Sequence, residues 1–324
     1  MRPTGWNGPP VAMPSLDEMR RAARFVEQET IVRTPLIPLQ SFKRDSQIWL
    51  KPETLQPIGS YKLRGVLYWA NQLDDDERQL GLSTHSAGNT AQALGVAAAH
   101  FQVSAKSLLP DRTPANKIEL IRRYGVEPHT MSMDALLEYV FSGCWQQEPI
   151  CYLNPWANDD MVAGNATIGL EIIDDLPSVR TVYVPVGGGG LMAGVGSALT
   201  QLVPDLRIVA VQPEACPALA ASLAAGKPTW VESRPTICDT SLPLIVDELY
   251  PLLERVVDDV ILVSDEEVIA AMQELFRGNH LVTEAAGAMS FAAARKDNPS
   301  GDAVCILSGA SIGADEFVEL MRRV

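Results

Sequence analysis

The sequence lacks the features that several large classes of protein require. Its five cysteines are odd in number and scattered, without a Cys-x-x-Cys pair, which favours reduced core thiols over disulfides or zinc. The four histidines are equally dispersed, so no His-based metal site is indicated. No apolar run approaches the roughly 18 residues of a membrane-spanning helix, and residues 1–10 lack the apolar core of a leader. We therefore expect a cytoplasmic protein with no membrane partner.

Positive charge is also scarce. The 324 residues include 26 Lys and Arg against 40 Asp and Glu, which gives a formal charge of −14. A field of that sign repels phosphate backbones and anionic lipid surfaces, so no nucleic acid is expected as a main partner. With 47% apolar and 20% charged residues, the chain can bury a sizeable core, and its length suggests about two domains.

Short apolar runs alternate with helical stretches along most of the chain. Ser15 and Ser264 each begin a capping box, which predicts a helix to about Gln28 and a second helix, with Phe276 on its apolar face, that stops at Gly278. The order strand, helix, strand predicts an α/β fold with parallel sheets flanked by helices and ligands at the carboxyl ends of strands. The predicted strands are 82–86, 104–109, 127–131, 150–153, 181–186, 206–212 and 303–308, and the predicted helices among them are 90–100, 115–124, 134–146 and 191–202.

One predicted strand runs into four consecutive glycines, 187–190, and then into a helix. Glycines there let backbone N–H groups approach an anion at the positive end of the helix dipole, which favours a phosphate ligand. The segment also contains Gly-x-Gly-x-x-Ala, ending at Ala193, so an NAD-dependent oxidoreductase is an alternative, with Glu214 as a poorly spaced ribose ligand. As a purely structural alternative, the four glycines would only allow the helix to pack closely on the strand.

Two further loops of small polar residues follow strands. Residues 85–92 offer N–H groups, a hydroxyl and a carboxamide that suit a carboxylate, although Ser86 and Asn89 can equally be caps of the next helix. The Ser-Gly-Ala-Ser segment 308–311 has the same two interpretations. Because these loops all follow carboxyl ends of strands, we expect them to converge on one crevice.

Lys62 is the candidate reactive group. The chain has only seven lysines, and this one lies between Tyr61 and Leu63 and not beside acidic residues. A lysine in a partly apolar site has a lowered pKa and can form an imine with a carbonyl group. An ordinary surface lysine is the structural alternative.

Taken together, these segments resemble the fold-type II enzymes that use pyridoxal 5'-phosphate (PLP), and specifically the threonine/serine dehydratase and serine racemase family. The resemblance covers nearly the whole chain, because the motifs occur in the family's order. They are Lys-Pro-Glu at 51–53, Gly-Ser-Tyr-Lys-Leu-Arg-Gly at 59–65, Ser-Ala-Gly-Asn at 86–89, Pro-Val-Gly-Gly-Gly-Gly-Leu at 185–191, Glu-Ala-Ala-Gly at 284–287 and Ser-Gly-Ala-Ser at 308–311.

The resemblance implies a two-domain fold like that of tryptophan synthase β, a homodimer, and PLP as the cofactor. A large PLP-binding domain would comprise residues 1–67 and 150–324, and a small α/β domain, 68–149, would be inserted in it. Lys62 would carry PLP and act as the catalytic base. The implied cofactor-binding residues are Lys62, Asn89, Gly187, Gly188, Gly189, Gly190, Leu191 and Ser308, and the implied substrate-binding residues are Ser86, Ala87, Gly88 and Thr90.

Departures from the family's pattern narrow the expected reaction. Similar serine racemases carry a serine where Ala87 stands, and racemisation needs proton transfer on both faces of the substrate, so Ala87 favours a dehydratase. No divalent cation is expected, because Gln212 and Ala218 occupy its usual acidic positions. We therefore expect an ammonia-lyase that converts a β-hydroxy amino acid, such as threonine, serine, hydroxyaspartate or a β-aryl serine, to a 2-oxo acid and ammonia. An amino acid racemase is the alternative.

Overall fold

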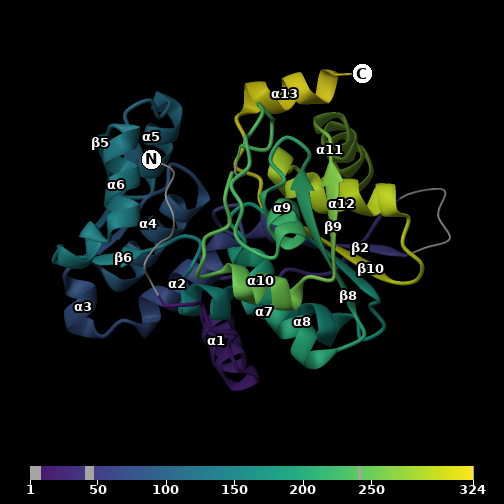
Figure 1. Cartoon of the computed structure of the whole chain (residues 1–324), viewed down its shortest axis with the longest axis horizontal. Coiled ribbons are helices and arrows are strands. Elements are labelled where there is room, and N and C mark those ends of the chain that lie inside the picture. Colours follow the sequence, from purple (N-terminus) through teal and green to yellow (C-terminus); the bar gives the residue numbers. More distant parts are fainter. Residues whose placement is uncertain (1–8, 41–46, 240–241, 324) are drawn as a thin grey trace.

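The structure is a computed structural model and describes residues 9–40, 47–239 and 242–323 (Figure 1). Residues 1–8, which belong to the segment 1–10 that was expected not to be a leader, lie outside these ranges. Within them, each helix is too short or too polar to cross a membrane. The described residues form two sheets, each covered by helices on both faces, so the predicted α/β fold class is confirmed.

The two predicted capping boxes begin helices. Ser15 and Ser264 each accept the N–H of the glutamate three residues later, at the first turns of α1 and α11. The helices are α1 (Leu16–Gln28), α2 (Lys62–Gln72), α3 (Asp75–Gln79), α4 (Asn89–Phe101), α5 (Ala115–Arg123), α6 (Met133–Ser142), α7 (Asp159–Asp175), α8 (Gly190–Leu202), α9 (Ala218–Ala225), α10 (Tyr250–Val256), α11 (Asp265–Asn279), α12 (Ala285–Asp297) and α13 (Ala314–Arg322), with 3-10 turns η1 (Glu53–Leu55) and η2 (Cys144–Gln147).

Four details predicted from the sequence are wrong. The helix expected over 134–146 ends at Ser142, because Gly143 takes a positive φ of 76° and a 3-10 turn follows. Helix α11 passes through Gly278, and its end is set by His280 with a φ of 57°. Phe276 is 42% exposed and does not share the buried face. The five cysteines form no disulfide with one another, but Cys144 is exposed and Cys151 is only half-buried, so these two are not core thiols.

The larger sheet has six strands, which are parallel except for the edge strand β1. Helices α8 and α10 cover one face, and α11 and α12 cover the other (Figure 1). In β7, Val182 and Val184 lie on the first face and Tyr183 on the second, so the strand is apolar throughout. The strand order is β1 (Ile37–Pro38), β2 (Ile48–Pro52), β10 (Ala303–Leu307), β7 (Thr181–Pro185), β8 (Arg207–Pro213) and β9 (Asp259–Val263).

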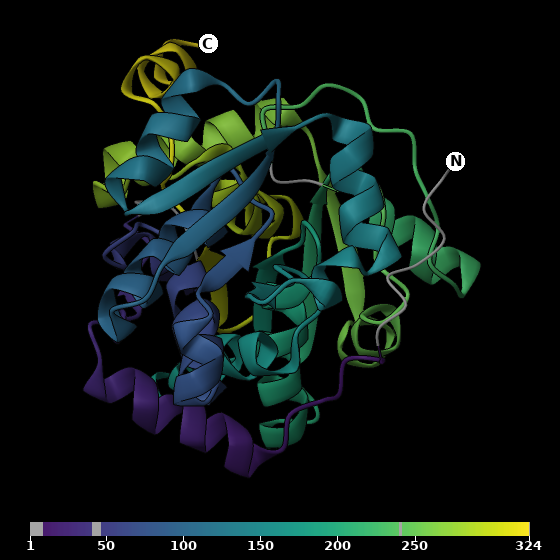
Figure 2. The same ribbon diagram turned by 90° about the vertical axis from the view of Figure 1, so that its left-hand side faces the viewer.

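The smaller sheet is parallel throughout, and Figure 2 turns it toward the viewer. Leu108 packs against α6 on one face, and its neighbour Leu109 packs against α4 and α5 on the other. The strand order is β5 (Val126–Met131), β4 (Ala105–Pro110), β3 (Leu82–Thr84) and β6 (Cys151–Leu153). Because β6 pairs with β3, this sheet extends past residue 150. The division into 1–67 with 150–324 and 68–149 stays a prediction, and the strand order favours a boundary a few residues later.

Candidate functional site

The loops that follow β3, β7 and β10 line one cavity of about 700 Å³. The convergence predicted from the sequence is therefore present, and Lys62 lies in the same wall. The roles given to the individual residues stay predictions, but all of these residues line this cavity: Lys62, Ser86, Ala87, Gly88, Asn89, Thr90, Gly187, Gly188, Gly189, Gly190, Leu191 and Ser308.

Lys62 is the first residue of α2, and backbone contacts to the loop after β10 fix its position. The N–H of Tyr61 donates to the carbonyl oxygen of Ser308 at 3.2 Å. The Nζ of Lys62 donates to the carbonyl oxygen of Pro155 at 3.3 Å. Burial lowers the pKa of Lys62 to about 8, while the charge of Glu284 acts in the opposite direction. Lys62 is thus a half-buried residue whose amine loses its proton readily, as a nucleophile or base requires.

The glycine loop leads directly into α8. Gly189 precedes the first helical residue with a φ of 100°, which favours glycine. A Cβ on Gly188 would lie 2.5 Å from Cδ1 of Trp156, and a Cβ on Gly189 would lie 2.6 Å from Leu253. Larger residues therefore do not fit here. The first N–H groups of α8 have no partner within the helix, so the loop suits a phosphate group.

The loop after β3 begins α4 without a side-chain cap, so the alternative in which Ser86 and Asn89 cap this helix is wrong. The hydroxyl of Ser86 accepts the N–H of Gly88 at 3.2 Å. The Nδ2 of Asn89 donates to Glu284 Oε1 at 3.1 Å, and its Oδ1 is buried without a partner among the described residues. A buried acceptor of this kind in a cavity wall suits a hydroxyl group of a ligand.

Three further residues of the cavity were not placed in the site from the sequence. Glu284 was only part of a quoted motif; burial, aided by the charge of Asp239, raises its pKa to about 7. The pKa of His85 falls to about 3, mainly because the ring is buried and also because of Lys62, so the imidazole is neutral. Trp156 lies edge-on to His85, with ring centroids 4.7 Å apart, and gave no signal in the sequence.

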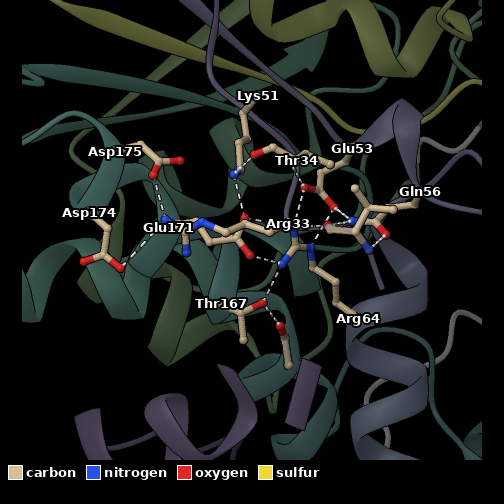
Figure 3. A network of polar contacts seen from close by, with 12 residues as sticks. Arg33, Thr34, Lys51, Glu53, Gln56, Arg64, Thr167, Glu171, Asp174 and Asp175 are labelled. Atoms are coloured by element: carbon tan, nitrogen blue, oxygen red, sulfur yellow. Dashed lines mark hydrogen bonds and ion pairs between the residues drawn. The ribbon is translucent and has the colours of Figure 1, made fainter. Parts of the chain in front are cut away.

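A network of buried charges beside the cavity joins α2 to α7 (Figure 3). The guanidinium of Arg64 lies 2.8 Å from Glu53 and 2.6 Å from Glu171, and Lys51 lies 2.6 Å from Glu171. These four side chains are at most 7% exposed, and their two positive and two negative charges balance. The network holds α2, and with it the helix end that carries Lys62.

Gln212, at the usual position of a cation ligand, and Glu214, the ribose ligand of the NAD alternative, have other structural roles. The Oε1 of Gln212 accepts the N–H groups of Leu219 and Ala220 at 2.8 and 3.1 Å, so this side chain caps α9. In the described ranges, no group of three or more His, Cys, Asp or Glu residues is arranged to hold a metal ion. Glu214, the ribose ligand of the NAD alternative, is exposed outside the cavity and lies 3.8 Å from Lys296.

Comparison with known proteins identifies the family. The family described as pyridoxal-phosphate dependent enzyme matches residues 28–309. The chain belongs to this family. PLP is therefore its cofactor, the expected PLP-dependent lyase class is confirmed, and the NAD-dependent alternative finds no support.

The similar proteins include both ammonia-lyases and serine racemases. Over 324 aligned residues the chain is 34% identical to L-threonine ammonia-lyase from Thermotoga maritima, covering 96% of this chain and 79% of that protein. It is 32% identical to serine racemase from Oryza sativa subsp. indica over 270 residues, which are 82% of this chain and 79% of that protein. The structure of maize serine racemase matches with a TM-score of 0.88 at 29% identity, over 96% of this chain and 97% of that one.

The described residues fit PLP. The amine of Lys62, with its lowered pKa, can bind its aldehyde, and the glycine loop before α8 can hold its phosphate. The unpartnered Oδ1 of Asn89 is available to its ring hydroxyl. These three groups line the same cavity.

Proposed function

We propose that the protein is a dehydratase, or ammonia-lyase, that converts a β-hydroxy amino acid to a 2-oxo acid and ammonia. The observation that supports this most is the methyl group of Ala87 in the cavity wall, where a racemase needs a second proton donor. An amino acid racemase is the second candidate, because serine racemases are among the relatives. The homodimer and the cytoplasmic location stay predictions.

Bound PLP withdraws electrons from the α-carbon of an amino acid. The Nζ of Lys62 would act as the base that takes the proton from this carbon, once the amino group of the substrate has replaced it at the aldehyde; its lowered pKa of about 8 leaves part of the amine uncharged near neutral pH. His85 stays neutral in this range and adds no positive charge beside Lys62. The β-hydroxyl would leave as water with the proton that Lys62 Nζ has taken up, and the resulting enamine would react with one water to give the 2-oxo acid and ammonia.

Borohydride reduction of the PLP-loaded protein, peptide mapping and a product assay test this proposal. We expect the pyridoxyl label on the peptide that contains Lys62. We also expect equal amounts of 2-oxo acid and ammonia from at least one β-hydroxy amino acid among threonine, serine, hydroxyaspartate and phenylserine. Lys62→Ala should lose both results, and Lys227→Ala, at an exposed position outside the cavity, should keep both.

Two results contradict the proposal. Label on another lysine would refute the role of Lys62. Inversion of the recovered substrate without 2-oxo acid, measured by chiral chromatography, would favour the racemase.

A further inference from the structure

We propose that the cavity selects β-hydroxy amino acids whose β-carbon carries an aryl group, of which β-phenylserine is the simplest. This inference rests on the proposed function and names its substrate class. It is carried by an apolar wall that one face of α6 contributes to the cavity of Lys62.

Helix α6 presents apolar side chains to the cavity at helical spacing. Met133, Leu137 and Phe141 follow one another at intervals of four residues, and Leu136 and Val140 lie on the same face. Leu136 and Val140 are buried, but Leu137 remains 39% exposed while it lines the cavity. An apolar wall open to a cavity is a surface that an apolar part of a ligand can cover.

Aromatic rings continue this wall toward Lys62. Trp156 directly follows Pro155, whose carbonyl oxygen accepts the hydrogen bond from Lys62 Nζ. The indole lies edge-on to His85 and also borders Gly188. Aromatic rings favour further rings at their faces and edges. An aryl group on the β-carbon would therefore contact Trp156 and His85 near Lys62 and the aliphatic face of α6 beyond them.

The cavity of about 700 Å³ has to hold PLP as well as the substrate, and the charges at its rim leave its outer part suited to an apolar group. At its rim, Lys117 and Asp239 pair with each other at 2.7 Å, so this pair adds no net charge to the rim. Arg112 also lines the cavity, and it makes hydroxyaspartate the competing substrate that the experiment must include.

The experiment compares kcat/KM of the PLP-loaded enzyme for β-phenylserine, threonine, serine and 3-hydroxyaspartate, in all stereoisomers. We expect phenylserine to exceed threonine by at least about tenfold, since one methylene group in an apolar pocket already changes kcat/KM by roughly 10- to 200-fold. Leu137→Gln should lower the phenylserine-to-threonine ratio about tenfold. The matched control is Leu80→Gln, which changes a leucine that is 51% exposed outside the cavity and should leave the ratio unchanged.

Binding of L-phenylalanine and L-alanine gives a measurement that does not depend on dehydration, because neither has a β-hydroxyl to lose. By calorimetry on the PLP-loaded protein, we expect phenylalanine to bind at least about tenfold more tightly, and Leu137→Gln to remove most of this difference.

The outcomes separate the two proposals. Preference for threonine, serine or hydroxyaspartate, with phenylalanine binding no better than alanine, overturns the aryl specificity and leaves the dehydratase in place. Tight phenylalanine binding without 2-oxo acid from any substrate supports the aryl specificity and overturns the dehydratase.

Discussion

The guanidinium of Arg64 lies 2.6 Å from the carboxylate of Glu171, although the two residues are 107 positions apart in the chain. Arg64 is two residues beyond Lys62 in α2, and Glu171 is in α7, so the ion pair joins the helix that begins at Lys62 to a core helix. Lys51 and Glu53 complete the network, and none of the four lines the cavity. The position of Lys62 thus depends on charges that do not contact a ligand.

Replacing Glu171 by glutamine should destabilise the protein strongly. The change leaves the buried cations of Lys51 and Arg64 with one carboxylate between them. We expect the free energy of unfolding of the apoprotein, measured in urea, to fall by about 3–5 kcal/mol. Asp174→Asn is the control: its side chain is 70% exposed, 4.0 Å from Arg33, and it should cost less than about 1 kcal/mol. If both variants lost the same free energy of unfolding, burial of the charge network would not account for its contribution to stability.

Replacing Gly189 by alanine should weaken both folding and PLP binding. The φ of 100° disfavours a side chain, and the new Cβ would lie 2.6 Å from Leu253, so we expect a loss of about 2–4 kcal/mol. Gly226→Ala is the matched control, because Gly226 has a φ of 64° but no atom within 4 Å of the added Cβ. It should cost about 1 kcal/mol and bind PLP normally in an absorbance titration. Normal PLP affinity of Gly189→Ala would argue against the phosphate site.

Glu284 should make the stability of the apoprotein depend on pH. Burial raises its pKa from 4.5 to about 7, so between these values the folded protein keeps a proton that the unfolded chain has lost. Stability contributed by this group therefore falls as pH rises through this window. Glu284→Gln should be no more stable than the native chain below pH 4.5 and more stable by roughly 3 kcal/mol above pH 7.

The measurement for Glu284 is the difference in unfolding free energy between the two apoproteins from pH 4 to 8. Glutamine keeps an oxygen that can accept the hydrogen bond from Asn89 Nδ2, so the comparison isolates the charge. A difference that does not change with pH would refute the raised pKa.

Replacing Ala87 by serine should add racemisation to the proposed dehydration. The substitution places a hydroxyl in the cavity wall, and a second proton donor is what exchange on both faces of the α-carbon requires. We expect chiral chromatography to detect the opposite enantiomer in substrate recovered from Ala87→Ser, but none from the native enzyme. Ala87→Gly, which changes the side chain without adding a hydroxyl, is the control. Equal racemisation by the native enzyme would support the racemase alternative.

The seven strands predicted from apolar runs are all present, but β1, β2 and β9 were not among the predicted strands. Strand β2 contains Lys51, whose charge makes the segment look exposed. Its buried ammonium pairs with Glu171, 120 positions away, and also donates to the carbonyl oxygen of Thr34. Strand β9 begins at the exposed Asp259 and has only one fully buried residue. When a strand is buried by residues that are far away in the chain, its own sequence carries no local pattern that predicts it.

In the candidate site, too, residues in local motifs were predictable and residues that depend on distant partners were not. Lys62 and the three loops were predictable because each is a local motif at a strand end or a helix start. The importance of Glu284 depends on Asn89, 195 positions away, and on the burial that raises its pKa. Trp156 has no motif at all, and its contacts with His85 and the glycine loop appear only when the chain is folded.

Helix α6 contributes five side chains to the cavity wall, whereas Lys62, Asn89 and the glycine loop belong to other elements. The residues proposed to face the outer part of a substrate and those proposed to face PLP are thus encoded in separate stretches of the chain. We therefore expect substitutions at Leu137 and its exposed neighbours in α6 to change the substrate preference and to leave the proposed reactive centre unchanged.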